Sequence, residues 1–426
     1  MKNFKKAIKT LVKWCLIGLC GYWILTTLIF GHAYIDETKY EYPIYWSGVD
    51  AYFNNEEIEF ALNKPVEVKL EGIDGPYIYG NYKYTVDIQN TLLKEPFDKQ
   101  QPILVQVKNN ESDSFEVSTK EAHYVEPHIY ELPNKLIAIS DIEGNFNAFY
   151  SFLLKNEVID KEYNWTFGKG HLVLNGDFVD RGGDVTQVLW LIYMLEEKAE
   201  KEGGKVHYII GNHEVMNLYG DHSDKDTKYI AVAKQISGKQ DWDEAGRYLF
   251  SADSELGKWL RSKNIVEKVG DYIFVHAGIK SKLIKENLTI PEINSIARKY
   301  YGLRTKKLVL NEKEQLILNS YDSPYWDRSY AMNLLIAGVF AFNDPFGASY
   351  HKTTQDETEE ILKFYNASKM VVGHNVVSDI TSDYDGKVIK IDVKHSHEKY
   401  SGKTKGLLIE NGIEYKVDDL GNKTKL

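Results

Sequence analysis

The chain has 426 residues, of which 43% are hydrophobic and 27% are charged, and its formal net charge is −10. This composition is typical of a globular protein with one large domain or two domains. The acidic balance, without a dense basic stripe beyond the N-terminus, argues against nucleic acid as a partner.

Residues 1–35 predict a basic cytoplasmic tail followed by a transmembrane anchor. Several lysines come before residues 14–30, which contain no charged side chain, and the uncharged run continues to Ile35. About 20 such residues suffice to cross a bilayer as a helix. Lysines before the span and acids after it place the N-terminus in the cytoplasm and the remainder outside, on the periplasmic side in a Gram-negative cell.

A cleaved signal peptide is the alternative interpretation of this segment. Gly31-His32-Ala33 could form a small-residue cleavage site. We favour the uncleaved anchor, because the apolar run is long for a signal peptide.

Residues 36–131 predict a small β-rich accessory region. Tyrosines and alternating apolar residues are frequent in it, and Gly72–Pro76 and Asn109-Asn110 are typical of turns. No constellation of catalytic side chains is present, so the sequence assigns this region no chemistry.

Residues 132–426 have the pattern of an α/β domain. Compact apolar strands are expected at 136–140, 171–175, 206–210, 272–275 and 370–372, and helices at 146–154 and 184–200. Asn411-Gly412 between two further apolar runs predicts a hairpin. Strands that alternate with helices indicate a sheet with buried strands.

Polar side chains follow each of these five strands. They are Asp141 and Glu143, then Asp177, Asp180 and Arg181, then Asn212 and His213, then His276, and finally His374. Each motif alone is weak evidence, because Asp, Asn and Gly are common after strands. Ligands bind beyond the carboxyl ends of strands in open α/β sheets, however, and here all five ends carry oxygen or imidazole donors. Such a set predicts a two-metal hydrolase, and without thiolates it suits Mn, Fe, Mg or Zn.

The motifs GDFVDRG, GNHE, HAG and VVGH, in this order, resemble those of the calcineurin-like metallophosphoesterases, and within them the phosphoprotein phosphatase family. The segments SPYWDR (323–328) and IDV (391–393) are similar to segments of the Shewanella-like phosphatase branch. The resemblance covers about residues 136–393. It implies a metallophosphoesterase-type β-sandwich flanked by helices, preceded here by the transmembrane helix and the β-rich region.

The resemblance also implies roles for individual residues. Two divalent cations, with manganese preferred, would be held by Asp141, Asp177, Asn212, His276 and His374, and Asp177 would be shared between them. His213 would donate a proton to the leaving alkoxide, and Asp180 would orient its imidazole. Arg181 and Arg328 would bind the phosphoryl oxygens through their guanidinium groups.

Glu143 departs from the family pattern D-x-H-G, because the chain reads Asp141-Ile142-Glu143-Gly144. In one interpretation Glu143 ligates the first cation through its carboxylate, which favours hard ions such as Mn²⁺ or Mg²⁺. In the other the first cation is lost or weakly held. We favour the ligand interpretation, because every other catalytic position is filled.

The predicted function is therefore a membrane-anchored phosphatase that hydrolyses phosphomonoesters, in proteins or small molecules, by a metal-bridged hydroxide. Two alternatives stay open, namely a nucleotide or dinucleotide polyphosphate hydrolase and a catalytically weak, phosphate-binding pseudophosphatase. The predicted catalytic domain spans residues 132–426.

Overall fold

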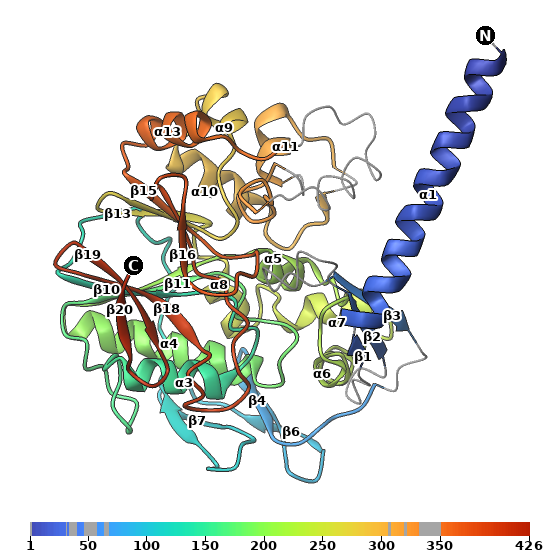
Figure 1. Cartoon of the computed structure of the whole chain (residues 1–426). Helices are drawn as coiled ribbons and strands as arrows, with labels where there is room; N and C mark the ends of the chain where they lie inside the picture. The colour runs from blue at the N-terminus through green and yellow to red at the C-terminus, as the bar shows by residue number, and fades with distance from the viewer. Residues whose placement is uncertain are drawn as a thin grey trace. The chain divides into compact units, whose positions relative to one another are not determined.

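The computed structural model describes residues 2–30, 32–33, 41–46, 58–63, 68–305, 308–318, 322–331 and 351–426 (Figure 1). The chain divides into two compact units, Met1–Glu67 and Val68–Leu426. Gly31 of the alternative cleavage site and the acidic residues after the apolar span lie outside the described residues.

The first unit consists of one long helix and a small sheet. Helix α1 (Lys2–Phe30) precedes an antiparallel sheet of β1 (His32–Ala33), β2 (Glu41–Trp46) and β3 (Ile58–Asn63). Within α1, Ile8–Thr26 has a mean hydropathy of 1.4 and is long and apolar enough to cross a membrane. A signal sequence meets the same criteria, so the anchor and its orientation stay predictions.

The second unit is built on two six-stranded sheets. The first has the order β12 (Lys205–Ile209), β11 (His171–Asn175), β10 (Lys135–Ile139), β18 (Lys405–Glu410), β19 (Ile413–Asp418) and β20 (Lys423–Lys425). The second has the order β16 (Thr381–Asp383), β17 (Val388–Lys390), β15 (Lys369–Val372), β14 (Tyr272–Val275), β13 (Val266–Val269) and β9 (Ile129–Tyr130). Strands β10, β11 and β12 run parallel, as do β14, β15 and β17. The five predicted strands and the predicted hairpin are thus confirmed.

Alternation along the strands explains how the sheets pack. Leu136 and Ala138 of β10 belong to a buried cluster that also contains Phe274 and Val371 of the second sheet. Ile137 and Ile139, which point the opposite way, belong to the other cluster. Asn175 links the two sheets, because its Nδ2 donates to the Val275 carbonyl at 3.0 Å and the Val371 carbonyl at 3.3 Å.

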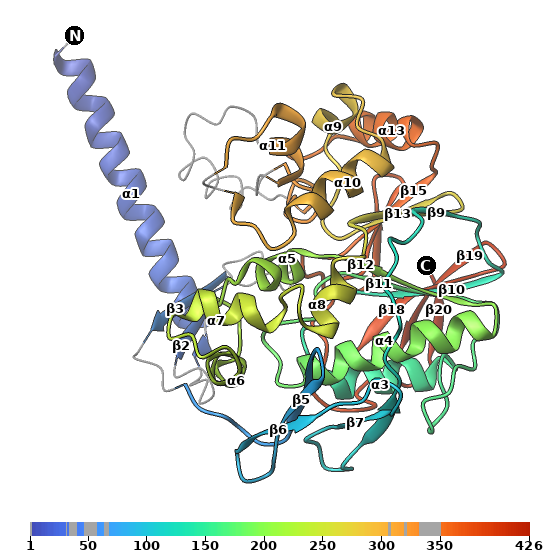
Figure 2. The ribbon, with the colours of Figure 1, turned by 180° about the vertical axis from the view of Figure 1, so that it is seen from behind.

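Helices flank the two sheets (Figure 1, Figure 2). Helices α3 (Phe146–Lys155) and α4 (Val185–Lys201) lie beside the first sheet, and α9 (Ser281–Lys285), α10 (Ile290–Tyr300) and α13 (Gln355–Phe364) lie beside the second. The others are α5 (Asn212–Tyr219), α6 (Thr227–Ser237), α7 (Trp242–Leu249), α8 (Glu255–Leu260) and α11 (Glu312–Leu318). Capping residues mark several starts: Thr289 and Glu292 form a capping box at α10, and Thr354 and Glu357 form another at α13.

Residues 68–131 share the core of the second unit. They form β4 (Asp74–Tyr79), β5 (Tyr82–Val86), β6 (Leu92–Pro96), β7 (Ile103–Gln106) and β8 (Ser114–Val117), so the described part of the predicted region is β-rich. Trp190 of α4 donates to the Pro76 carbonyl at 2.8 Å, and Gln187 donates to the Gln106 carbonyl at 3.1 Å. The division at residue 131 into an accessory region and a catalytic domain stays a prediction, because residues on both sides of it belong to one compact unit.

Candidate metal centre

The carboxyl ends of strands from both sheets meet at the predicted site. Asp177 follows β11, His276 follows β14 and His374 follows β15. Their ligand atoms all lie within 4.8 Å of one another, and all three residues are buried. Residues separated by up to about two hundred positions therefore present one carboxylate and two imidazoles to a common point.

The donor atoms at this point fit a divalent cation. His276 Nε2 lies 2.9 Å from Asp177 Oδ2 and 3.0 Å from Asn212 Oδ1. The position of that amide oxygen is also 2.9 Å from His374 Nδ1. With its nitrogen in this position the Asn212 amide would donate to the same neighbours, and with its oxygen there a cation between the four groups would satisfy all of them.

The second nitrogen of His276 supports the same interpretation. Its Nδ1 lies 2.9 Å from the Asn175 carbonyl. This contact places a proton on Nδ1, so Nε2 is the nitrogen that would ligate a cation at the common point.

Asp141 adds a further carboxylate next to this group. The backbone N–H of His374 donates to Asp141 Oδ2 at 3.2 Å. Burial raises the pKa of Asp141 to about 7. The charge of His276 opposes this shift, and the charge of Asp177 adds to it. Burial also raises the pKa of Asp392 well above its usual value, and the charges of Asp141 and Glu143 reinforce this. Such a gathering of buried acids fits a site that holds positive charge.

Glu143 contacts the guanidinium of Arg181 through Oε1. It is not one of the three residues in the compact group. Burial raises its pKa, and Arg181 opposes that shift. Oε1 is engaged by Arg181, and no other described contact places the carboxylate against the compact group, so the ligand role of Glu143 stays a prediction.

His213 and Asp180 form a buried pair beside Asp177. His213 Nδ1 lies 2.9 Å from Asp180 Oδ2, and its Nε2 lies 3.8 Å from Asp177 Oδ2. Burial alone would lower the pKa of His213, but Asp177 and Asp180 raise it to about 10. The contact with Asp180 places one proton on Nδ1, so Nε2 is the nitrogen that would carry a second, transferable proton.

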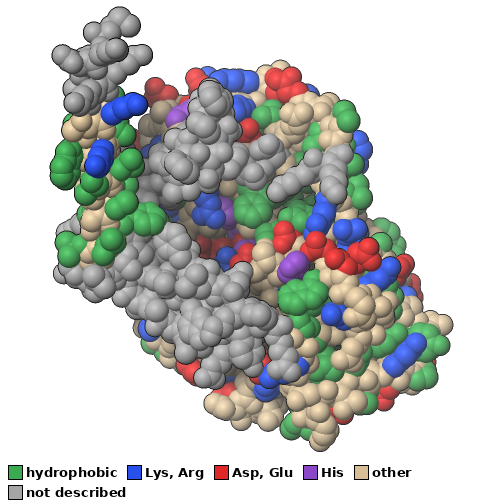
Figure 3. Space-filling model, turned by 90° about the vertical axis from the view of Figure 1, so that its right-hand side faces the viewer, with side chains coloured by type: hydrophobic (Ala, Val, Ile, Leu, Met, Phe, Trp, Pro, Cys, Tyr) green, Lys and Arg blue, Asp and Glu red, His purple; other side chains and the backbone are tan. Residues whose placement is uncertain are grey.

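Two guanidinium groups lie close to the acids and imidazoles. Arg181 has a side chain that is 46% exposed, and Arg328 Nη1 donates to Asn375 Oδ1 at 3.0 Å. Burial lowers the pKa of His374, and the positive charge of Arg328 lowers it further. The face in Figure 3 has a hollow in which basic, acidic and histidine side chains gather.

The turns after the strands adopt backbone conformations that most residues avoid. Positive φ angles between 49° and 67° occur at Asp141, Glu143, Asp177, Asp180, Arg181 and His374. Each costs about 1–2 kcal/mol, and such positions concentrate at functional sites. Glycine is required at Gly211, where a Cβ atom would lie 2.2 Å from Asp177 Oδ1.

Sequence reasoning missed Glu214, which ties two of the turns together. Its carboxylate accepts from the backbone N–H groups of Asp177, Phe178 and Gly211 at 2.7–3.0 Å. The GNHE motif contained the signal, because a carboxylate three residues into a helix commonly caps its start. Lys225, which lies beside Asp180, has no such signal in the sequence.

The family model described as Calcineurin-like phosphoesterase matches residues 135–378. The chain belongs to the calcineurin-like phosphoesterase family. This family consists of metal-dependent hydrolases, typically with two divalent ions, so the predicted enzyme class is confirmed.

Particular relatives are Shewanella-like phosphatases. The chain is similar to Shewanella-like protein phosphatase 2 of Arabidopsis thaliana, with 37% identity over 308 residues, 62% of this chain and 72% of the relative. It is also similar to Shewanella-like protein phosphatase 1 of Plasmodium berghei, with 28% identity over 240 residues, 56% of this chain and 60% of the relative. The crystal structure of a cold-active protein-tyrosine phosphatase from a psychrophilic Shewanella species matches with a TM-score of 0.69 and 29% identity, over 84% of this chain and 100% of that one. The predicted resemblance is confirmed.

Proposed function

We propose that this protein is a membrane-anchored, metal-dependent phosphatase that hydrolyses phosphomonoesters in proteins or small molecules. The observation that carries the proposal is the buried group of Asp177, His276 and His374 beside His213, whose Nδ1 lies 2.9 Å from Asp180 Oδ2. A metal-dependent phosphatase needs ligands that hold its cations and a group that donates a proton to the leaving oxygen.

Six side chains would hold the two cations. Asp141, Glu143 and Asp177 would hold the first, and Asp177, Asn212, His276 and His374 the second. When bound, the two ions supply Lewis acidity that activates water and positive charge that offsets the phosphoryl oxygens. Carboxylate, amide and imidazole donors suit manganese, and iron, zinc and magnesium are the other candidates.

His213 would protonate the leaving oxygen. Asp180 holds Nδ1, so Nε2 is the nitrogen that carries the transferable proton. The carboxylate fixes the ring orientation and stabilises the imidazolium before transfer. After transfer the neutral ring regains a proton from water, and no covalent phosphoenzyme is needed.

Arg181 and Arg328 would bind the non-bridging phosphoryl oxygens. Glu143 contacts Arg181 at one end of the guanidinium, and Asp224 Oδ1 lies 3.8 Å from its Nε. These two acids hold the side chain over the acidic turns, where a bidentate contact with phosphate fits its planar fork.

The names of the relatives favour phosphorylated protein as the substrate. The plant and parasite relatives are called protein phosphatases, and the Shewanella structure is a protein-tyrosine phosphatase. We therefore place phosphotyrosine, phosphoserine and phosphothreonine ahead of dinucleotide polyphosphates.

The test is hydrolysis of 4-nitrophenyl phosphate by the full-length chain in non-ionic detergent, with Mn²⁺, Mg²⁺, Co²⁺ or Zn²⁺. We expect activity with metal, loss of activity in Asp177→Asn, and retention in Asp379→Asn, a surface carboxylate that pairs with Lys405 and Lys416. Equal activity without metal or in Asp177→Asn would refute the proposal. A preference for diadenosine tetraphosphate over phosphopeptides would instead favour the dinucleotide alternative.

The anchor is tested separately by membrane fractionation. We expect the chain to stay in the membrane pellet after an alkaline wash and to be released when residues 1–35 are deleted. Release of the intact chain by the wash would contradict the anchor, and release of a shortened chain would indicate a cleaved signal peptide.

A further inference from the structure

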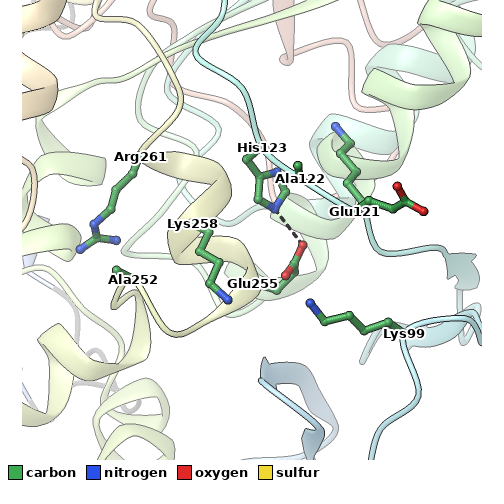
Figure 4. Close-up of a pocket in the computed structure, with 9 residues that line it drawn as sticks. Lys99, Glu121, Ala122, His123, Ala252, Glu255, Lys258 and Arg261 are labelled. Carbon is green, nitrogen blue, oxygen red and sulfur yellow. Dashed lines mark hydrogen bonds and ion pairs between the residues drawn. The ribbon is translucent and has the colours of Figure 1, made fainter.

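A pocket of about 360 Å³ lies between the chain around Lys99, the segment that follows β8, and helix α8. None of the metal-centre residues lines it. Its lining includes Lys99, Lys120, His123, Glu255, Lys258 and Arg261, most of which Figure 4 labels. The lining thus contains four cationic side chains and two glutamates, although the chain as a whole has a net charge of −10.

Three of these cations, Lys99, Lys258 and Arg261, form no ion pair within the part of the chain that the structure describes. Arg261 Nη1 donates to the carbonyls of Phe250 and Gly257 at 2.5 and 2.9 Å, and burial lowers the pKa of Arg261. A partly buried guanidinium with only neutral partners keeps its full charge in a medium that solvates it poorly.

The two carboxylates in the pocket offset these three cations only in part. Burial opposes ionisation of Glu255, but its hydrogen bonds to His123 and Tyr193 and the charge of Lys99 lower its pKa. Glu255 Oε1 is 2.8 Å from His123 Nε2 and also accepts from the Tyr193 hydroxyl at 2.8 Å. Lys120 pairs with Glu196 at 2.5 Å, so both partners of that pair are engaged. The carboxylate of Glu121 points away from the other labelled side chains in Figure 4.

The geometry points to a binding site for a small polyanion whose charge is carried by phosphate or carboxylate groups. Arg261 and Lys258 come from the α8 side and Lys99 from the opposite side, so a ligand needs more than one anionic group to reach them. Guanidinium and ammonium groups bind both kinds of oxyanion. The only apolar lining side chains are those of Ala122 and Ala252, which favours a compact polar ligand.

The pocket is also large enough for such a molecule. Small-molecule sites span roughly 300–1,000 Å³, so this one lies at the lower end of that range. The inference does not rest on the proposed phosphatase function, because the two sites share no residue.

The experiment is calorimetric titration of the full-length chain in non-ionic detergent and metal-free buffer. Methylenediphosphonate probes phosphate-like groups and citrate probes carboxylates. The pocket variant is Lys99→Glu with Lys258→Glu, and the control is Lys161→Glu with Lys169→Glu, which reverses the same charge at two other exposed lysines. Arg261 is left intact because it supports two backbone carbonyls.

We expect at least one probe to bind, with a Kd raised about ten-fold or more in the pocket variant and unchanged in the control. Binding of one probe alone identifies the phosphate or the carboxylate class. The Asp177→Asn chain should keep this binding, and the pocket variant should keep its turnover of 4-nitrophenyl phosphate, which verifies its fold. The inference is overturned if neither probe binds, or if the pocket variant and the control bind equally.

Discussion

Nζ of Lys225 lies 3.7 Å from Oδ1 of Asp180, and the two side chains are only 2% and 3% exposed. Asp180 in turn holds His213, and Asn217 donates to the same carboxylate at 2.7 Å. Burial opposes ionisation of Asp180, but Lys225 and His213 lower its pKa. Lys225 therefore helps to keep Asp180, the partner of the proposed proton donor His213, charged. Lys225 itself is not one of the proposed cation ligands.

Replacement of this lysine should affect poor leaving groups most. We expect Lys225→Met to reduce kcat about ten-fold on an alkyl phosphate, whose leaving oxygen needs a proton. The loss should be smaller on 4-nitrophenyl phosphate, because that leaving group departs as a stable anion. The measurement is kcat over a series of substrates that differ in leaving-group pKa.

A matched control is Lys228→Met. Lys228 is also buried, but it lies 3.8 Å from Asp74 rather than near the metal centre. The Lys228→Met variant should be less stable, and the dependence of its kcat on the leaving-group pKa should be unchanged. Equal losses on all substrates in Lys225→Met would show that Lys225 acts on folding alone.

His213→Asn should separate proton transfer from metal binding. We expect kcat to fall by about 10²–10³ while metal content stays unchanged, because His213 is not among the proposed ligands. Metal analysis and turnover are measured on one sample. The control is His222→Asn, since His222 also pairs with an aspartate, Asp243, at 2.6 Å. Loss of bound metal in His213→Asn would assign the imidazole to the ligands instead.

Glu143→Ala tests the departure from the family pattern. If Glu143 ligates the first cation, affinity for the second equivalent of Mn²⁺ should fall by at least about ten-fold. Glu143→His, which restores the imidazole of the family pattern, should still bind two ions. If Glu143 serves only to hold Arg181, both variants will bind metal normally, and KM will rise in Glu143→Ala.

Glu196 should stabilise the protein at neutral pH and lose this effect in acid. Burial opposes its ionisation, but Lys263 and Lys120 lower its pKa from 4.5 to about 2. Because the folded-state pKa is the lower one, the stabilisation is present above pH 4.5 and lost as the pH falls towards 2. We expect Glu196→Gln to reduce the free energy of unfolding by on the order of 3 kcal/mol at pH 7, since Lys263 is left buried without one of its partners.

Urea unfolding at pH 7, 5 and 3 measures this difference. The difference in the free energy of unfolding between Glu196→Gln and the unmodified chain should be smaller at pH 3 than at pH 5. Glu197→Gln is the control on the same helix, because Glu197 forms an exposed pair with Lys201 and should change stability by about 0.5 kcal/mol or less. A difference between Glu196→Gln and the unmodified chain that does not vary with pH would contradict the assigned charge state.

Much of the fold could be predicted because its signals are local. The apolar run at 135–139 and the glycine-led turn after β11 specify a buried strand and a sharp turn from neighbouring residues alone. The Asn411-Gly412 hairpin follows in the same way, since both residues tolerate the positive φ angles that the turn requires. These signals placed the candidate residues at strand ends, and the order of the motifs indicated the family.

Side-chain partners across long separations were decided only by the tertiary structure. Glu143 follows β10, but its contact with Arg181 exists because β10 and β11 run parallel and bring their carboxyl ends to one edge. Lys225 belongs to a loop without any motif and reaches Asp180 only through the packing of that loop. The strand order and the grouping of Lys99, Lys258 and Arg261 at one pocket arise similarly. Local pattern encodes how each segment is buried, whereas the identity of the segment packed against it depends on the energy of the whole folded chain.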